Sequence, residues 1–195
     1  RKVLLNEDFS LNANLVLEAI DDCTKVVFFF FSNNPTGNLL NRNEMLKIIN
    51  GFQGIVVIDE AYIDFASEPS WLNDLDNYPN LIVLQTFSKA WGLAAVRCGM
   101  AFASEEILSY FNKVKYPYNV NLLTQKFVEK ELSYEERKKE WVKMLLDERD
   151  NLIQELKKLS IVKSVFPADA NFGLVKVTDA KFIYTALMNK GVIVR

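Results

Sequence analysis

Continuously apolar segments separated by helix-like sequence constrain the fold of this chain more than any other feature. The clearest are Val26–Phe31, Gly54–Asp59 and Leu81–Gln85, with Arg97–Ala103 as a fourth candidate. A strand that is apolar on both faces has to be covered on both faces, as in parallel sheets with helices on each side. Between the first two strands, Asn41 and Glu44 have the spacing of a capping box, which predicts a helix ending near Asn50. The first part of the chain is therefore predicted to be α/β, with strands that are fully buried.

The pattern changes in the second part of the chain. Ser133 and Glu136 form a second capping-box pattern, which predicts a long helix over 134–159. Apolar residues recur along it at helical spacing, namely Trp141, Leu145, Leu152, Leu156 and Leu159. A strand over 170–177, a helix over 180–190 and a final strand in "GVIVR" are expected to follow. We therefore predict two domains, 1–118 and a smaller α+β domain over 119–195.

Composition excludes several classes of function. Half of the residues are hydrophobic, which is enough for a sizeable core, and the net charge of −2 gives no reason to expect nucleic-acid binding. We expect no membrane association, because the apolar runs are too short to span a bilayer and no signal peptide is visible. The two cysteines, Cys23 and Cys98, show no disulfide or metal-ligand spacing, so a reduced, cytoplasmic setting is expected.

The chain contains no histidine. Catalysis by Ser-His-Asp or Cys-His groups and histidine-ligated metal sites are therefore excluded within it, and we predict no metal site. Acid–base chemistry would depend on lysine, tyrosine, cysteine or carboxylate side chains.

Polar side chains follow each predicted strand. They are Asn34 in "NNPTG", Asp59 and Tyr62 in "IDEAY", Thr86, Ser88 and Lys89 in "TFSKAWG", and Arg97 just before the fourth strand. In open α/β sheets, ligands bind at the carboxyl ends of the strands. These side chains are therefore the candidate site.

Each of these side chains also has an ordinary structural explanation. "NNPTG" is a good turn sequence, and Asp59 could cap the next helix. Lys89 could be a solvated surface lysine, Arg97 half of an ion pair, and Tyr62 a core aromatic residue. The functional interpretation depends on their occurring together and in this order.

In this order, "NNPTGNLL", "VVIDEAYIDF", "LQTFSKAWGLAAVRCGMAFAS", "YPYNVN" and "ANFGLVKV" resemble the fold-type I pyridoxal-phosphate-dependent aminotransferases. Within that group the chain is similar to the histidinol-phosphate aminotransferases. The resemblance extends over nearly the whole chain. It implies a three-layer, mostly parallel sheet from the family's large domain, followed by part of its smaller C-terminal domain.

The resemblance also implies a role for each candidate. Lys89 matches the lysine that bonds to the cofactor aldehyde and moves a proton at the substrate Cα. Asp59 matches the partner of the pyridine nitrogen, and Tyr62 and Asn34 match the partners of the phenolic oxygen. Phosphate-binding positions match Ser88 and Arg97, and more weakly Thr86.

Two further residues are implied in substrate binding. Arg195 matches an arginine that contacts the anionic end of the substrate, although it could also be a solvated residue at a strand end. Asn171 falls at a polar position near the site and could instead only hold its strand. Two residues depart from the usual pattern of the family, because Ser32 stands where proline is usual and Ala95 where glycine is usual; a methyl group at Ala95 could crowd the phosphate.

The resemblance implies transamination between L-histidinol phosphate and 2-oxoglutarate in histidine biosynthesis, by a homodimer. A related aromatic aminotransferase, a threonine-phosphate decarboxylase, and an inactive or non-enzymatic phosphate-binding module stay open as alternatives. The chain has no initial methionine, and the family's glycine-rich phosphate loop, stacking aromatic and second substrate arginine are not found in it. We therefore expect the 195 residues to be an excerpt that is inactive in isolation.

Overall fold

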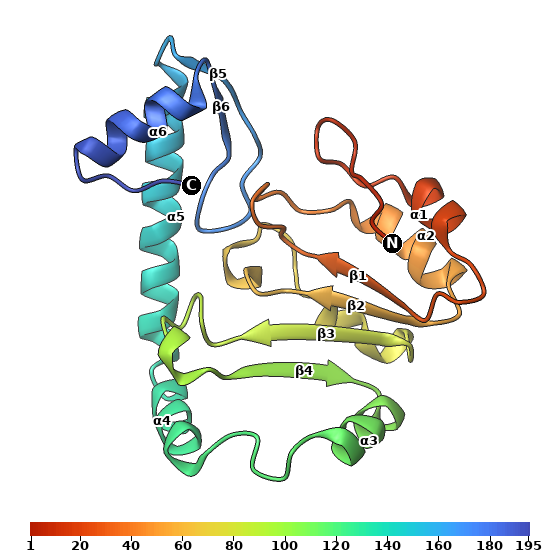
Figure 1. Ribbon diagram of the computed structural model, residues 1–195. Helices are drawn as coiled ribbons and strands as arrows, with labels where there is room; N and C mark the ends of the chain where they lie inside the picture. Colours follow the sequence, from red (N-terminus) through yellow and green to blue (C-terminus); the bar gives the residue numbers. More distant parts are fainter.

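A four-stranded sheet in the order β1-β2-β3-β4 forms the centre of the computed structural model, which describes residues 1–195 (Figure 1). Its strands are β1 (Val26–Phe30), β2 (Ile55–Asp59), β3 (Leu81–Thr86) and β4 (Gly99–Ala103). The short helices of this part are α1 (Ala13–Ala19), α2 (Arg42–Gly51), η1 (Ile63–Phe65), η2 (Trp71–Asn77) and η3 (Ala94–Val96). The later elements are α3 (Glu105–Val114), α4 (Leu122–Leu132), α5 (Glu135–Lys157), β5 (Val162–Val165), β6 (Val175–Val177) and α6 (Ala180–Asn189).

The sheet is mostly parallel, as predicted. β1 pairs with β2 and β2 with β3 in parallel, whereas β4 is antiparallel to β3. The carboxyl ends of the first three strands therefore lie at one edge of the sheet. Because β4 runs the other way, its amino end lies at that same edge.

The main core lies between the sheet and helices α1, α2 and η2. Phe29 and Phe31 are buried in it, but Phe28 and Phe30 are 60% and 51% exposed. The prediction of a fully buried first strand is therefore wrong. β1 is an edge strand, and within this chain only one of its faces is covered, so burial alternates with the period of the pleat.

At the start of α2, one of the two hydrogen bonds of the predicted capping box is present. The Asn41 side chain accepts a hydrogen bond from the Glu44 N–H at 3.1 Å. The Glu44 carboxylate does not return this bond but accepts from the Ala13 N–H at 2.8 Å, which joins α2 to the start of α1.

The second predicted capping box is wrong. Ser133 follows α4, a helix that the sequence did not predict, and its hydroxyl donates to the Lys130 carbonyl at 2.7 Å. Ser133 therefore ends one helix instead of starting the next, and α5 begins at Glu135. The predicted apolar stripe of α5 is also exposed at Trp141, Leu145 and Leu152, because α5 packs through the adjacent face.

The end of the chain has less regular structure than predicted. The strand expected over 170–177 is only the short β6, and the final segment, Gly191–Arg195, forms no strand. β6 pairs instead with β5, which the sequence did not predict, while α6 confirms the expected last helix. No helix in the chain combines the length and hydropathy needed to cross a membrane.

Gly54 lies just before β2, where the backbone leaves no room for a side chain. A Cβ at this position would lie 2.5 Å from the Lys25 carbonyl oxygen and 2.4 Å from the Phe52 ring. We expect Gly54→Ala to lower the free energy of unfolding by roughly 2 kcal/mol or more in urea denaturation, because backbone has to move. The control is Gly173→Ala, whose Cβ would meet Ile153 at an ordinary 3.4 Å. Equal stability changes in the two variants would contradict this explanation.

Candidate functional site

Strand register brings the predicted candidates to one edge of the sheet. Phe30, the last residue of β1, is paired with Asp59, and Asp59 is paired with Leu84 of β3. Thr86, the last residue of β3, is paired with Gly99, the first residue of β4. The segments that follow these strand ends carry Asn34, Tyr62 and Lys89, so the sheet places them near one another.

Asn34 and Tyr62 are in direct contact, although they are far apart in sequence. The Asn34 amide nitrogen lies 3.2 Å from the Tyr62 hydroxyl, to which it donates. The Tyr62 ring is buried at 7% exposure, while Asn34 is exposed. The Lys89 Nζ lies 5.1 Å from the centroid of the same ring. An amide, a phenol and an exposed primary amine therefore lie together.

Asp59 is half-buried at the end of β2. One carboxylate oxygen accepts the Ala61 N–H at 2.9 Å, which fixes the turn that leads to Tyr62. This bond is the local turn-stabilising role that is common for aspartate. It engages one of the two carboxylate oxygens and leaves the acceptor capacity of the other for a ligand.

The proposed phosphate-binding residues lie around the end of β3. The Thr86 hydroxyl accepts the Ser88 N–H at 3.0 Å, which shapes the turn before Lys89. Arg97 has a left-handed backbone with φ 53° and donates to the Ala94 carbonyl at 3.0 Å. The exposed guanidinium retains further donors, and Ala95, where the family usually has glycine, is also exposed.

No hydrogen bond or ion pair joins the two proposed substrate residues to this group. Asn171 and Arg195 are both exposed, and Arg195 belongs to the irregular segment after α6. The residue after Asn171 does reach the site, because the Phe172 ring packs edge-on against Tyr62 with centroids 5.3 Å apart. Ser32, the other departure from the family pattern, is buried and donates to the Asp169 carbonyl at 2.8 Å.

Sequence reasoning missed Glu60, the neighbour of Asp59. Its carboxylate is 1% exposed and accepts from the Ser70 hydroxyl and the Trp71 N–H at 2.6 Å each, and from Gln85 at 2.9 Å. It therefore ties the start of η2 to β3, close to the strand end that leads to Lys89. The only sequence signal was an acidic residue next to Asp59, which does not distinguish a buried carboxylate from a solvated one.

We expect Glu60→Ala to lower the free energy of unfolding by about 3 kcal/mol, because three donors would lose a charged acceptor in the protein interior. Glu60→Gln should cost less, since its amide oxygen still accepts. Urea denaturation monitored by circular dichroism measures both. Glu68→Ala, at an exposed position, is the control, and a similar loss there would contradict the assignment.

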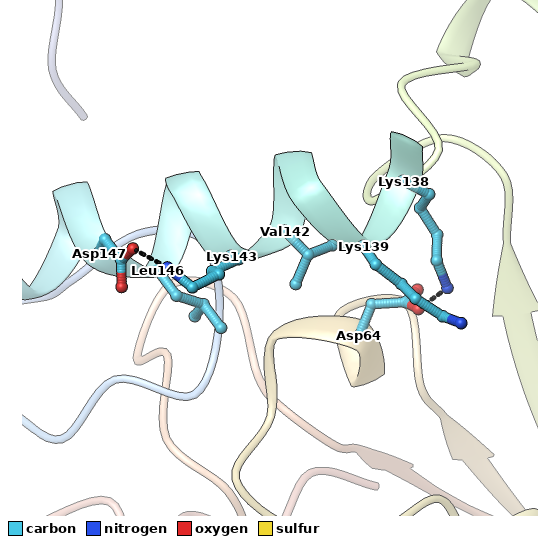
Figure 2. Close-up of a pocket in the computed structure, with 7 residues that line it drawn as sticks. All are labelled: Asp64, Lys138, Lys139, Val142, Lys143, Leu146 and Asp147. Atoms are coloured by element: carbon cyan, nitrogen blue, oxygen red, sulfur yellow. Dashed lines mark hydrogen bonds and ion pairs between the residues drawn. The ribbon is translucent and has the colours of Figure 1, made fainter. Parts of the chain in front are cut away.

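A cavity of about 280 Å³ lies between α5 and η1, beside the segment that carries Tyr62 (Figure 2). Lysines line it, but each is paired: Lys138 with Asp64 at 2.6 Å, Lys139 with Glu136 at 2.8 Å and Lys143 with Asp147 at 2.9 Å. The hydrogen bonds that Lys139 donates to Glu136 and, to a smaller extent, to Glu135 raise the pKa of Lys139 above its ordinary value. The cavity therefore offers no unpaired cation for an anion. Of these ion pairs, the one between Lys138 and Asp64 attaches α5 to η1, and the other two lie within α5.

The chain belongs to a family of enzymes that fits this fold and this strand-edge group. The family described as aminotransferase class I and II matches residues 1–195, the whole chain, and the chain is a member of it. This membership confirms the predicted fold class of a mostly parallel α/β sheet from the pyridoxal-phosphate-dependent transferases.

Individual relatives within this family are named histidinol-phosphate aminotransferases. The chain is 53% identical over 195 residues to the histidinol-phosphate aminotransferase of Bacteroides fragilis, covering 100% of this chain and 56% of that protein. It thus spans little more than half the length of that relative. Among solved structures, the histidinol-phosphate aminotransferase of Clostridium acetobutylicum matches with a TM-score of 0.89 at 25% identity, over 98% of this chain and 59% of that one.

The histidinol-phosphate aminotransferase of Sinorhizobium meliloti, solved in complex with pyridoxal-5'-phosphate, matches with a TM-score of 0.87 at 22% identity. The match covers 100% of this chain and 55% of that one, and it supports the fold.

Proposed function

We propose that the protein is a pyridoxal-phosphate-dependent aminotransferase that exchanges an amino group between L-histidinol phosphate and 2-oxoglutarate in histidine biosynthesis. The observation that supports this most directly is the meeting of Asn34, Tyr62 and Lys89 at the strand edge that also holds Asp59. The similarity to histidinol-phosphate aminotransferases supports the substrate.

The polar side chains at this edge of the sheet fit this cofactor. When bound, pyridoxal phosphate supplies the electron sink for a carbanion at the substrate Cα. The Lys89 amine would hold the cofactor aldehyde and then carry the proton at Cα. The Asp59 carboxylate would keep the ring nitrogen protonated, while Tyr62 and Asn34 would bind the phenolic oxygen.

The other candidate residues are assigned to the cofactor phosphate and to the substrate. Ser88 and Arg97, with Thr86 in a weaker role, would bind the cofactor phosphate through a hydroxyl and a guanidinium. Asn171 and Arg195 would bind substrate. No metal takes part in the proposed chemistry, which is carried by these side chains.

The proposal extends to the organisation of the protein. We assign residues 1–118 to the cofactor-binding domain and 119–195 to the linking helix and the smaller domain. We further propose a cytoplasmic homodimer that acts on small molecules and uses neither nucleic acid nor membrane.

The test compares substrates for the protein at its full natural length with cofactor supplied. We expect the kcat/KM for L-histidinol phosphate with 2-oxoglutarate to exceed that for L-phenylalanine and L-tyrosine, with no carbon dioxide released from O-phospho-L-threonine. A preference for the aromatic amino acids would favour the related aromatic aminotransferase, and release of carbon dioxide would favour the decarboxylase. No binding of cofactor would favour the non-enzymatic module.

A further inference from the structure

Phe172 belongs to the second part of the chain, yet its ring contacts the candidate site. The rings of Phe172 and Tyr62 meet edge to face, with an interplanar angle of 86° and centroids 5.3 Å apart. Lys89 lies near the same Tyr62 ring, with its Nζ 5.1 Å from the centroid. The Tyr62 ring is therefore a neighbour of both the lysine and Phe172.

Phe172 also contacts the turn that carries Asn34. A Cβ on Gly37 would lie 3.4 Å from the Phe172 ring, so this ring packs directly on the turn backbone. Gly37 has φ +77°, and its N–H donates to the Asn33 carbonyl at 2.7 Å. Phe172 thus touches both segments that are joined by the bond between Asn34 and Tyr62.

The segment that carries Phe172 is anchored to these surroundings. The Asp169 N–H donates to the Gly37 carbonyl at 2.7 Å, and the Asp169 carboxylate accepts from the Ser67 hydroxyl at 2.6 Å. The Ala170 carbonyl accepts from Arg149 of α5 at 2.9 Å. These bonds act on the backbone before Phe172 and hold its ring against Tyr62.

Tyr62 and Phe172 also belong to, or pack against, a small apolar cluster. Ala170, Phe65 and Ala90, the neighbour of Lys89, are buried with Tyr62 in one cluster, separate from the main core. Phe172 packs against this cluster together with Val142 and Leu146, whose side chains project from α5 (Figure 2). The orientation of the Tyr62 ring is therefore determined partly by residues beyond the sheet.

We propose that Phe172 is a positioning residue, which acts through Tyr62 by holding its hydroxyl where it and Asn34 can bind the phenolic oxygen of the cofactor. This inference rests on the proposed function. It assigns to the second part of the chain a role in binding the cofactor, in addition to any contact with substrate.

The test is a double-mutant cycle on the full-length protein, with pyridoxal phosphate affinity measured by titration of its visible absorption band. Phe172→Ala should weaken binding about 3- to 10-fold, the value of one aromatic contact. Tyr62→Phe removes the hydroxyl on which Phe172 acts. In that background Phe172→Ala should have no further effect, whereas a purely structural contribution would persist. Phe182→Ala, at a 69% exposed aromatic residue, is the control and should leave affinity unchanged.

The outcomes separate this inference from the proposed function. Unchanged affinity in Phe172→Ala, or an equal loss with and without the Tyr62 hydroxyl, overturns the inference while cofactor binding stands. Absence of binding in the unmodified protein and the Phe182→Ala control overturns the proposed function, and the inference with it. If Phe172→Ala does not fold, Phe172→Leu replaces it in the cycle; failure of both to fold assigns the ring to stability alone and overturns the inference.

Discussion

Replacement of Lys89 by alanine is expected to reduce transamination by the full-length protein by about 1,000-fold or more. The variant loses the only group near Tyr62 proposed both to bond to the cofactor aldehyde and to move the Cα proton, and proton transfer alone is worth several orders of magnitude. Steady-state kinetics with L-histidinol phosphate and 2-oxoglutarate measures the loss in kcat. Because Lys89 is exposed, the substitution should change the unfolding midpoint little.

Lys143→Ala provides the matched control for this prediction. Its side chain is 79% exposed and paired with Asp147 on α5, so its loss should leave kcat unchanged. An Lys89→Ala variant that retains most of its activity would remove Lys89 from the proposed chemistry, and equal losses in the two variants would indicate a general effect of lost charge.

Replacement of Asp59 by asparagine is expected to lower kcat by about 100- to 1,000-fold. The amide is nearly the same size as the carboxylate and can still accept from the Ala61 N–H, but it carries no charge to keep the ring nitrogen protonated. The loss of one preorganised electrostatic contact of this kind has an effect of that order. Rapid single-turnover kinetics would assign the loss to the chemical step.

Two variants control for this interpretation. Asp59→Glu retains the charge and should lose less activity than Asp59→Asn. Asp22→Asn removes an exposed aspartate whose carboxylate makes no hydrogen bond or ion pair, and it should have no effect. If Asp59→Asn is as active as the unmodified protein, the Ala61 contact is its main role, and Asp59 is a turn residue.

The four strands of the main sheet could be predicted from the sequence because their apolar runs are short and bounded by turn residues. The environment of the first strand could not, since "VVFFFF" does not reveal that β1 is an edge strand with Phe28 and Phe30 exposed. The start of α5 was mispredicted because a serine that ends one helix has the same local pattern as one that starts the next. The exposed Trp141 stripe shows the same limit: helical spacing identifies an apolar face but not the face that packs.

The contact between Asn34 and Tyr62 agrees with the sequence prediction, because parallel strands bring their carboxyl ends to one edge. The positions of Glu60 and Phe172 could not be predicted in this way. Glu60 depends on donors from η2 and β3, and Phe172 on a loop anchored from several directions. Tertiary contacts of this kind leave no periodic pattern in the sequence.

The most direct measurement is the site of covalent attachment. The full-length protein is incubated with limiting pyridoxal phosphate, reduced with borohydride and digested, and its peptides are analysed by mass spectrometry. We predict a pyridoxyl group on Lys89, with little on exposed lysines such as Lys143. Modification spread evenly over exposed lysines, or absent from Lys89, would contradict the proposed function.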